Sequence, residues 1–234
     1  MSNTSKGEGK KGSKYWMQLL ANLEGGKGLT KEIQKKDSTI GNITWISPLK
    51  EYNYEEYKLN NNSPNLSVLG ICKKDMDFWP AGQPQWDAIG FVESEPKTII
   101  LVEAKAHLDE MNSSCTAKSD ESKELIEITL EEIYKNLSHN KDKKFDKYIW
   151  MEKHYQLGNR LAFLYKLKEK GYDVKLVLLN IVNDPTWGDK KASEMEWTQH
   201  YDDIFTELLG SKELPEDVIV LNLDNINELP LSEF

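Results

Sequence analysis

Two neighbouring stretches form the centre of this chain: residues 85–92, QWDAIGFV, and residues 98–106, TIILVEAKA. Both have the composition of β-strands, and the second is a continuous aliphatic run, typical of a strand that is covered on both faces. The polar residues 93–97 between them, ESEPK, have the composition of a tight turn. The two stretches are therefore predicted to pair as an antiparallel hairpin.

The register of this hairpin brings charged side chains together. With the turn centred on Glu95, Asp87 lies opposite Glu103, and directly opposed Cβ atoms are about 4.5–5.5 Å apart. Because side chains alternate between faces, Lys105 shares the face of Glu103. One face should thus gather an aspartate, a glutamate and a lysine. The same register also makes two apolar pairs: Ile89 with Leu101, and Phe91 with Ile99.

Two carboxylates held close together in a poorly hydrated place repel one another unless a proton or a cation relieves them. A divalent metal is the natural relief, and hard oxygen ligands suit Mg²⁺ or Mn²⁺. The adjacent Lys105 could orient a metal-bound water and help to deprotonate it. This combination is typical of hydrolytic enzymes.

The residues Asp87 and then Glu103-Ala104-Lys105 resemble the signature of the PD-(D/E)XK superfamily, the restriction-endonuclease-like nucleases. That signature is an aspartate on one strand and Glu/Asp-x-Lys on the next. In this chain Trp86, rather than proline, precedes the aspartate, and the nearest proline is Pro84. The resemblance covers residues 79–182.

The resemblance implies an α/β fold of the restriction-endonuclease-like type, with a mixed central sheet flanked by helices. It also implies a metal-dependent phosphodiesterase that leaves a 5′-phosphate and a 3′-hydroxyl. As a hypothesis, Asp87, Glu103 and the backbone carbonyl of Ala104 bind Mg²⁺ or Mn²⁺. Lys105 then positions the attacking water and stabilises the charge that develops on the phosphorane.

Other interpretations of the same residues stay open. A Glu-x-Lys triplet occurs often by chance in a lysine-rich chain. Glu103 and Lys105 could instead form a buried salt bridge whose only role is to stabilise the edge of a sheet. The chain could also be a binding or interaction module that keeps the nuclease scaffold without catalysis. A third alternative is the hydrolysis of a small phosphate ester.

Length and composition favour one folded domain, residues 14–234, after a Lys/Gly/Ser-rich tail, residues 1–13, that is expected to be disordered. No apolar run approaches the roughly 20 residues of a membrane-spanning helix. Cys72 and Cys115 have no metal-ligand spacing, which fits a reducing compartment, and a cytoplasmic protein is therefore expected. The sequence leaves the oligomeric state open, a homodimer included.

The net charge of −9 is unusual for a nucleic-acid enzyme, since a phosphate backbone normally requires a basic surface. The charges are unevenly distributed. Residues 1–36 contain eight lysines and three acids, and residues 141–153 contain five lysines and three acids. Either segment could contact DNA, although a run of charges is more often a solvated face.

Further helices and strands are predicted around the hairpin. Helices are expected at 15–23, 30–36, 120–137, 145–170 and 193–209, and strands at 43–46, 174–182 and 218–221. Residues 68–71 could be a short strand or the end of a helix, and residues 51–64 an excursion or lid. The strand at 174–182 should be central and parallel to its neighbour, because a helical crossover precedes it. Glu24, at the end of the first helix, is a further candidate acid for the metal site.

The predicted helix at 145–170 contains Arg160, the single arginine among 30 basic residues. A guanidinium offers a planar fork for phosphate or carboxylate, so Arg160 could bind substrate or form an ion pair with an acid at the end of a strand. Residues 155–161, YQLGNRL, resemble a helix of a bacterial subgroup of the superfamily, in which polar side chains face the metal cleft. The resemblance therefore implies that Gln156, Arg160 and Tyr155 take part in substrate binding.

Overall fold

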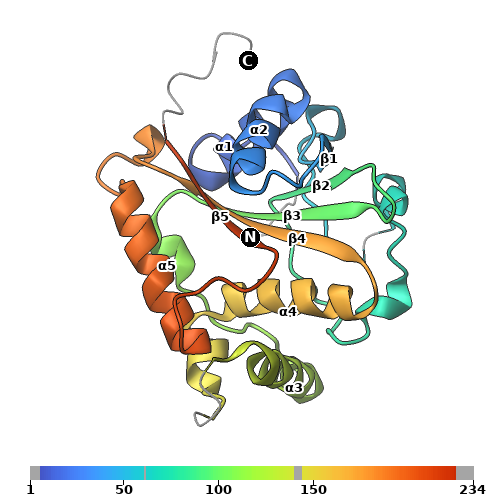
Figure 1. Ribbon diagram of the computed structural model, residues 1–234, viewed down its shortest axis with the longest axis vertical. Helices are drawn as coiled ribbons and strands as arrows, with labels where there is room; N and C mark the ends of the chain where they lie inside the picture. Colours follow the sequence, from blue (N-terminus) through green and yellow to red (C-terminus); the bar gives the residue numbers. More distant parts are fainter. Residues whose placement is uncertain (1–5, 61, 140–143, 225–234) are drawn as a thin grey trace.

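A mixed five-stranded sheet forms the centre of the fold in the computed structural model, which describes residues 6–60, 62–139 and 144–224 (Figure 1). The order in the sheet follows the order in the chain, β1-β2-β3-β4-β5. The strands are β1 (Ile43–Ser47), β2 (Ala88–Val92), β3 (Thr98–Lys105), β4 (Asp173–Ile181) and β5 (Val218–Leu223). The first three are antiparallel, and β3, β4 and β5 are parallel.

The predicted hairpin register is confirmed for the residues that pair. Ile89 lies opposite Leu101 and Phe91 opposite Ile99. Strand β2 begins at Ala88, later than the predicted residue 85, so Asp87 directly precedes the paired region. The parallel pairing of β4 with β3 is also confirmed, because α3 and α4 provide the crossover between them.

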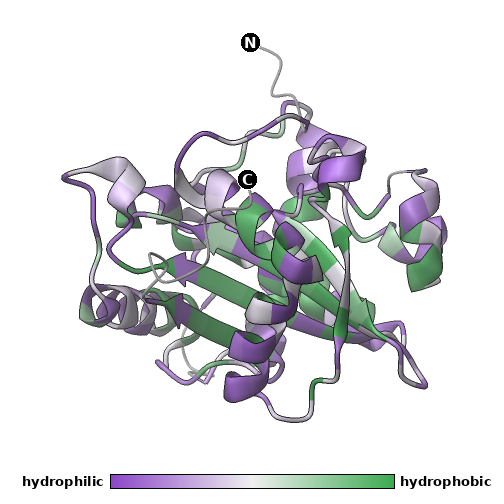
Figure 2. Ribbon diagram, turned by 90° about the horizontal axis from the view of Figure 1, so that it is seen from above, coloured by the Kyte–Doolittle hydropathy of each residue, from purple (hydrophilic) through white to green (hydrophobic). Residues whose placement is uncertain are grey.

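Helices cover both faces of the sheet (Figure 1). Helices α1 (Gly12–Asn22) and α2 (Lys27–Lys36) lie on one face, and α3 (Asp120–Leu137), α4 (Tyr155–Glu169) and α5 (Glu194–Leu209) on the other. Side chains alternate along β3 between the two cores that result: Ile100 and Val102 pack with α1 and α2, while Ile99 and Leu101 pack with α3, α4 and α5. Figure 2 shows the apolar strands enclosed by helices with hydrophilic outer surfaces.

Local sequence explains where the helices begin and end. Helix α5 starts with a capping box, in which Ser193 Oγ accepts from the backbone N–H of Glu196 and the Glu196 carboxylate accepts from that of Ser193. It ends at Gly210, which adopts the left-handed conformation that favours glycine (φ 78°). Helix α3 has the predicted bounds, and Ser119 caps it.

The predicted helix at 145–170 is interrupted. A π-helix, Ile149–Lys153, precedes α4, and His154 between them leaves the helical conformation (φ −121°, ψ 33°). Ser113 lies against the chain at this point. Its carbonyl accepts from the Tyr155 N–H (3.2 Å) and its hydroxyl from the Gln156 N–H (2.7 Å). The loop therefore supplies the acceptors that a continuous helix would supply, and hydrophobic periodicity cannot reveal this exchange.

Residues 6–13, the later part of the predicted tail, contact the domain. Helix α1 begins at Gly12, and the N–H of Gly9 donates to Gln18 Oε1 (2.7 Å). The N–H of Gly7 donates to the carbonyl of Asn53 (2.8 Å). The folded part thus begins before residue 14, while residues 1–5 of the predicted tail lie outside the described residues.

Two further predictions are settled by the fold. Residues 68–71, predicted as a short strand or the end of a helix, begin with the end of a 3-10 helix, Pro64–Leu69, so the helical alternative is confirmed. Among the described residues, no helix has the length and apolar character needed to cross a bilayer.

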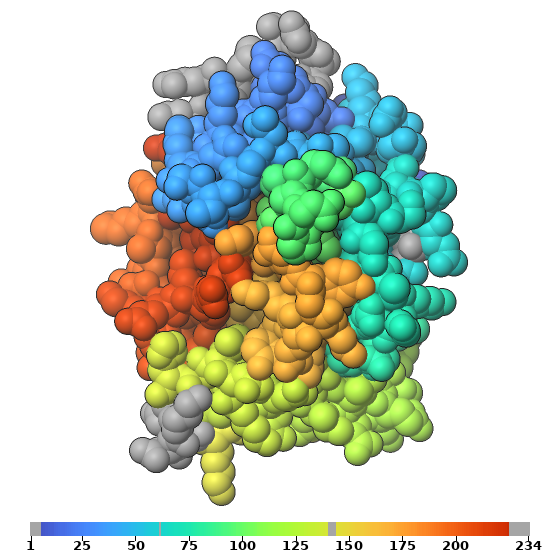
Figure 3. All heavy atoms as spheres, turned by 45° about the vertical axis from the view of Figure 1, so that its right-hand side comes forward, coloured from blue at the N-terminus to red at the C-terminus, as the bar shows by residue number. Residues whose placement is uncertain are grey.

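The hairpin turn lies at the end of the sheet away from Lys105. Figure 3 shows it in green, between the N-terminal residues in blue and the connection from α4 to β4 in orange. The pairing of Thr98 with Asp173 joins these segments. Asp87, Glu103 and Lys105 therefore lie at the opposite end of β2 and β3 from the turn.

Close packing of β1 against β2 generates a prediction at Gly90. A Cβ added to Gly90 would lie 2.6 Å from Ile43 Cγ2 and 3.1 Å from a ring atom of Trp45. We expect Gly90→Ala to lower the free energy of unfolding by about 1–3 kcal/mol, because such overpacking forces the strands to shift. Gly82→Ala is the control, since a Cβ there meets nothing within 4 Å. Urea denaturation tests this, and equal stabilities of the two variants would contradict it.

Candidate active site

The three charged residues of the predicted hairpin site lie together at the end of β2 and β3. Asp87 Oδ2 accepts a hydrogen bond from the backbone N–H of Ala104 (2.7 Å). Lys105 Nζ donates to Glu103 Oε1 in a short, nearly buried ion pair. Glu103 and Lys105 are 5% and 7% exposed, whereas Asp87 is partly exposed. Asp87 is thus the most exposed of these three residues.

Arg160 completes the ion pair. Its Nε donates to Glu103 Oε2 (2.7 Å), and its Nη2 lies closer still to the same oxygen. Nη2 also donates to the carbonyl of Gln85, and Nη1 to Asn159 Oδ1, both at 2.8 Å. The guanidinium stacks over the ring of Trp86, 4.5 Å from its centroid. With Arg160 only 2% exposed, the structure gives it the ion-pair role and not that of a free substrate ligand.

These contacts fix the charges of the pair. Burial raises the pKa of Glu103, but the positive charges of Arg160 and Lys105 outweigh burial and hold this pKa below its ordinary value. Burial lowers the pKa of Lys105, but the negative charges of Glu103 and Asp87 outweigh it and raise this pKa above its ordinary value. At neutral pH Glu103 is therefore a carboxylate and Lys105 an ammonium.

Asp87 has the opposite tendency. Removal of its carboxyl from water, together with the negative charge of Glu103, raises the pKa of Asp87 to about 8. Asp87 Oδ1 has no hydrogen-bond partner within the described part of the chain. A carboxyl in this state favours a proton or a cation beside it.

Glu56 is an additional acid that the sequence did not indicate. It follows β1, in the stretch 51–64 that has no clear periodicity, and is partly exposed. The Gln85 side chain donates to its carbonyl (3.3 Å), and Trp86 N–H donates to the carbonyl of Tyr57 (3.1 Å). Burial, together with the charge of Glu103, raises the pKa of Glu56 to about 7. Glu56 therefore belongs to the electrostatic surroundings of the site.

The remaining candidates are separated. Gln156 is partly exposed and lines a cavity of about 10 Å³ with Glu103 and Lys105, room for about one water. Tyr155, by contrast, stacks on Trp79. Glu24 is exposed in the turn after α1. Ser13 lies at the opposite end of α1, which is the end near the site, and the helix separates the two residues by roughly 16 Å. Of these three residues, the structure brings only Gln156 to the site.

The donor atoms fit a magnesium ion that keeps several waters. The described residues hold no group of three or more His, Cys, Asp or Glu side chains that could enclose a metal. Protein ligands would therefore be the two carboxylates of Asp87 and Glu103 and a main-chain carbonyl. The N–H of Ala104 points to Asp87, and its C=O points to the same edge, because a strand residue directs both groups to one side. One or two carboxylates with waters is the ligand set that Mg²⁺ prefers.

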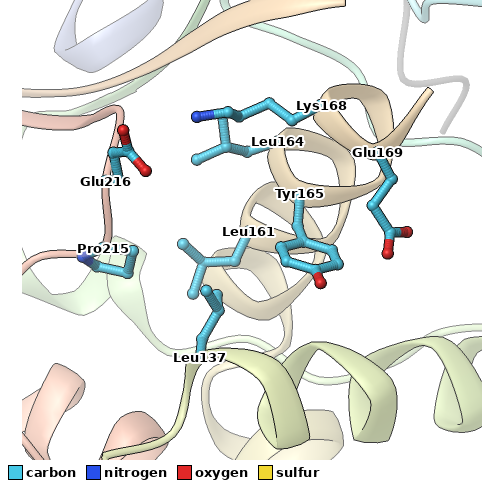
Figure 4. A pocket seen from close by; sticks show the side chains of 8 residues that line it. All are labelled: Leu137, Leu161, Leu164, Tyr165, Lys168, Glu169, Pro215 and Glu216. Atoms are coloured by element: carbon cyan, nitrogen blue, oxygen red, sulfur yellow. The ribbon is translucent and has the colours of Figure 1, made fainter. Parts of the chain in front are cut away.

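A separate hollow lies farther along α4 and contains none of these acids. Its volume is about 200 Å³, and Figure 4 shows its mainly apolar lining between the end of α3, α4 and the segment before β5. The lining residues are Leu137, Leu161, Leu164, Tyr165, Lys168, Glu169, Pro215 and Glu216. Lys168 is paired with Asp217, so its charge is already compensated.

Comparisons with protein-family models, with curated proteins and with solved structures found no match to this chain. The geometry of Asp87, Glu103, Lys105 and Arg160 is therefore the basis for assigning a function.

Removing Arg160 should leave Glu103 as a poorly compensated buried charge. We expect Arg160→Met to lower the free energy of unfolding by about 3–5 kcal/mol, and Glu103→Gln in the same chain to restore at least about half of the loss. The control is Lys147→Met, which breaks an exposed pair with Glu127 and should cost at most about 1 kcal/mol. Urea denaturation measures all three, and a loss below about 1 kcal/mol for Arg160→Met would contradict the ion-pair role.

The raised pKa of Asp87 makes stability depend on pH. Since this pKa rises from 3.8 to about 8 on folding, the stabilising contribution of the protonated carboxyl is complete below about pH 4 and is lost as the pH rises through 8. The free energy of unfolding should therefore fall more between pH 5 and pH 8.5 in the wild-type protein than in Asp87→Asn. Denaturation at the two pH values tests this, and the same fall in both proteins would refute the assigned pKa.

Proposed function

We propose that this protein is a metal-dependent nuclease of the PD-(D/E)XK type that hydrolyses phosphodiester bonds, with DNA as the substrate. The observation that carries the proposal is the meeting of Asp87, the Ala104 backbone of β3 and the Glu103–Lys105 pair at one end of the hairpin. The mixed sheet between two helical layers supports the restriction-endonuclease-like fold that is part of this proposal.

Asp87, Glu103 and the carbonyl of Ala104 would hold Mg²⁺ or Mn²⁺. The bound metal supplies Lewis-acid activation of the phosphate and lowers the pKa of a bound water. For Oε1 of Glu103 to serve as a ligand, Lys105 has to release it, whereas Arg160 can keep Oε2. Arg160 is thus a positioning residue that keeps Glu103 charged and oriented.

Lys105 acts as a cation in this proposal. Its raised pKa makes it a poor general base at neutral pH, so the proton of the attacking water would pass to solvent and not to Lys105. Once free of Glu103, the ammonium can orient the attacking water and stabilise the negative charge that develops on the phosphorane oxygens. Gln156, at the cavity beside it, offers an amide for the same phosphate.

The scissile phosphate approaches from the Asp87 side. The cavity beside Glu103 and Lys105 has room for about one water, which is too little for a nucleotide. Strand β2 ends its pairing at Ala88 opposite Val102, so β3 extends beyond it toward Lys105. Asp87 contacts this part of β3 at the Ala104 N–H, and the side chains of Asp87 and Glu56 are both partly exposed.

A binding module that keeps this scaffold without catalysis is the alternative, and one observation favours it: both oxygens of Glu103 are engaged by Lys105 and Arg160. Calorimetric titration with Mg²⁺ separates the two functions. A nuclease should bind the ion in the wild-type protein and lose this binding in Asp87→Ala, whereas a silent module needs no such site. Binding that is equal in both proteins would exclude Asp87 as a ligand.

Cleavage tests the role of Lys105. The substrates are single-stranded DNA, duplex DNA and RNA, each with Mn²⁺. We expect the wild-type protein to cut DNA. Lys105→Ala should cut it at least roughly 100-fold more slowly, because this variant lacks the ammonium that stabilises the negative charge on the phosphorane. Lys175→Ala is the matched control, because Lys175 is also a strand lysine paired with an acid, Asp217 (2.7 Å). Circular dichroism checks folding. Equal rates for Lys105→Ala and the wild-type protein would refute the role.

A further inference from the structure

A group of basic residues surrounds Trp187, next to the site end of β3. The ammonium of Lys11 lies 3.9 Å from the centroid of the Trp187 ring, and that of Lys190 lies 5.9 Å from it. Lys10, Lys11, Lys190 and Lys191 are exposed, and Lys14 is partly exposed. We call Lys10, Lys11, Lys14, Trp187, Lys190 and Lys191 the lysine–tryptophan surface.

This surface is held together by contacts between α1 and the loop that follows β4. Trp16 Nε1 donates to the buried Asp184 (2.8 Å), and the Gly12 N–H donates to Thr186 Oγ1 (2.9 Å). A Cβ on Gly12 would lie 2.5 Å from Trp187 Nε1, so only glycine lets the indole lie so close to the helix. The lysines from two distant segments are therefore pre-arranged on a rigid support.

The surface is continuous with the candidate active site. Glu110 accepts from the Ala106 N–H, directly after β3, and from the hydroxyl of Ser13, next to Lys14. The charge of Lys14 acts on Glu56, and that of Glu110 acts on Lys105. His107 packs edge-on against Trp187, with 4.8 Å between ring centroids.

We propose that the lysine–tryptophan surface binds the phosphate backbone of DNA and leads the strand to the edge at Asp87. The inference rests on the proposed nuclease function, which supplies the reason for a polyanion at this place. In a chain of net charge −9, a local group of lysines at one end of the sheet provides the attraction that the average charge opposes. Asp109 compensates Lys190 only at the surface, since 72% of the Asp109 side chain is exposed.

Binding measured without catalysis tests the surface. Fluorescence anisotropy of labelled 20-nucleotide single strands and 20-base-pair duplexes in EDTA, over a series of salt concentrations, gives the affinity and its salt slope. Lys11→Gln with Lys190→Gln should weaken binding by roughly tenfold or more at low salt and make the salt slope shallower by about 1.4–1.8. The matched control is Lys73→Gln with Lys74→Gln, two exposed lysines at the other end of the sheet, and it should change neither.

Trp187→Leu keeps the charge and removes the ring that holds the lysines, and it should weaken binding roughly threefold. Three results would refute the surface: the wild-type protein does not bind DNA, the two double lysine variants bind DNA equally well, or polyglutamate displaces DNA at the same concentration of negative charge. Loss of cleavage with unchanged binding in EDTA would instead refute the active-site assignment alone. If the wild-type protein cleaves DNA but Lys11→Gln with Lys190→Gln leaves the affinity for DNA unchanged, only the surface would be refuted.

Discussion

The ion pair between Arg160 on α4 and Glu103 on β3 is the interaction on which the rest of the site depends. A buried carboxylate is unfavourable unless cations and hydrogen bonds compensate it. Arg160 and Lys105 supply this compensation, and they keep Glu103 ionised although it is only 5% exposed. The guanidinium also ties α4 to the segment before β2 through the carbonyl of Gln85. The same pair therefore joins three segments and sets the charge of the site.

The charge on Glu103 has a direct consequence for its neighbours. It adds to the desolvation that raises the pKa of Asp87 and of Glu56, and it favours the ammonium form of Lys105. The result is a compact arrangement with one fixed carboxylate, Glu103, two acids that readily accept a proton, and two fixed cations, Arg160 and Lys105. In the proposed nuclease, a divalent ion would replace the protons on Asp87 and Glu56, and Lys105 would become free for a phosphate.

The central hairpin could be predicted from the sequence because its signals are local. Period-two alternation and a five-residue turn fix the register, and this register brings Asp87 to β3 at Ala104, between Glu103 and Lys105 in the sequence. Helix α3 could equally be predicted from the sequence, because its apolar stripe and its N-cap lie within one segment. The fold class and the parallel pairing of β4 followed from the order of the elements.

Features that depend on contacts between distant segments could not be predicted. The interruption at His154 arises from Ser113, about 40 residues earlier in the chain. Glu56 lies near the site because Gln85 and Trp86 donate hydrogen bonds to the backbone of its loop. Hydrophobic periodicity does not indicate these hydrogen bonds. For Arg160 the sequence left a phosphate and a carboxylate partner equally open, and the tertiary fold decides in favour of Glu103.

The most direct measurement of the central claim is a crystal structure of the protein with Mn²⁺, with the ion located by its anomalous scattering. We expect one Mn²⁺ bound by Asp87, Glu103 and the carbonyl of Ala104, with Arg160 still on Glu103 Oε2 and Lys105 Nζ withdrawn from Oε1. Crystals at saturating Mn²⁺ without an ion at these three residues, and with Lys105 still paired to Glu103, would contradict it.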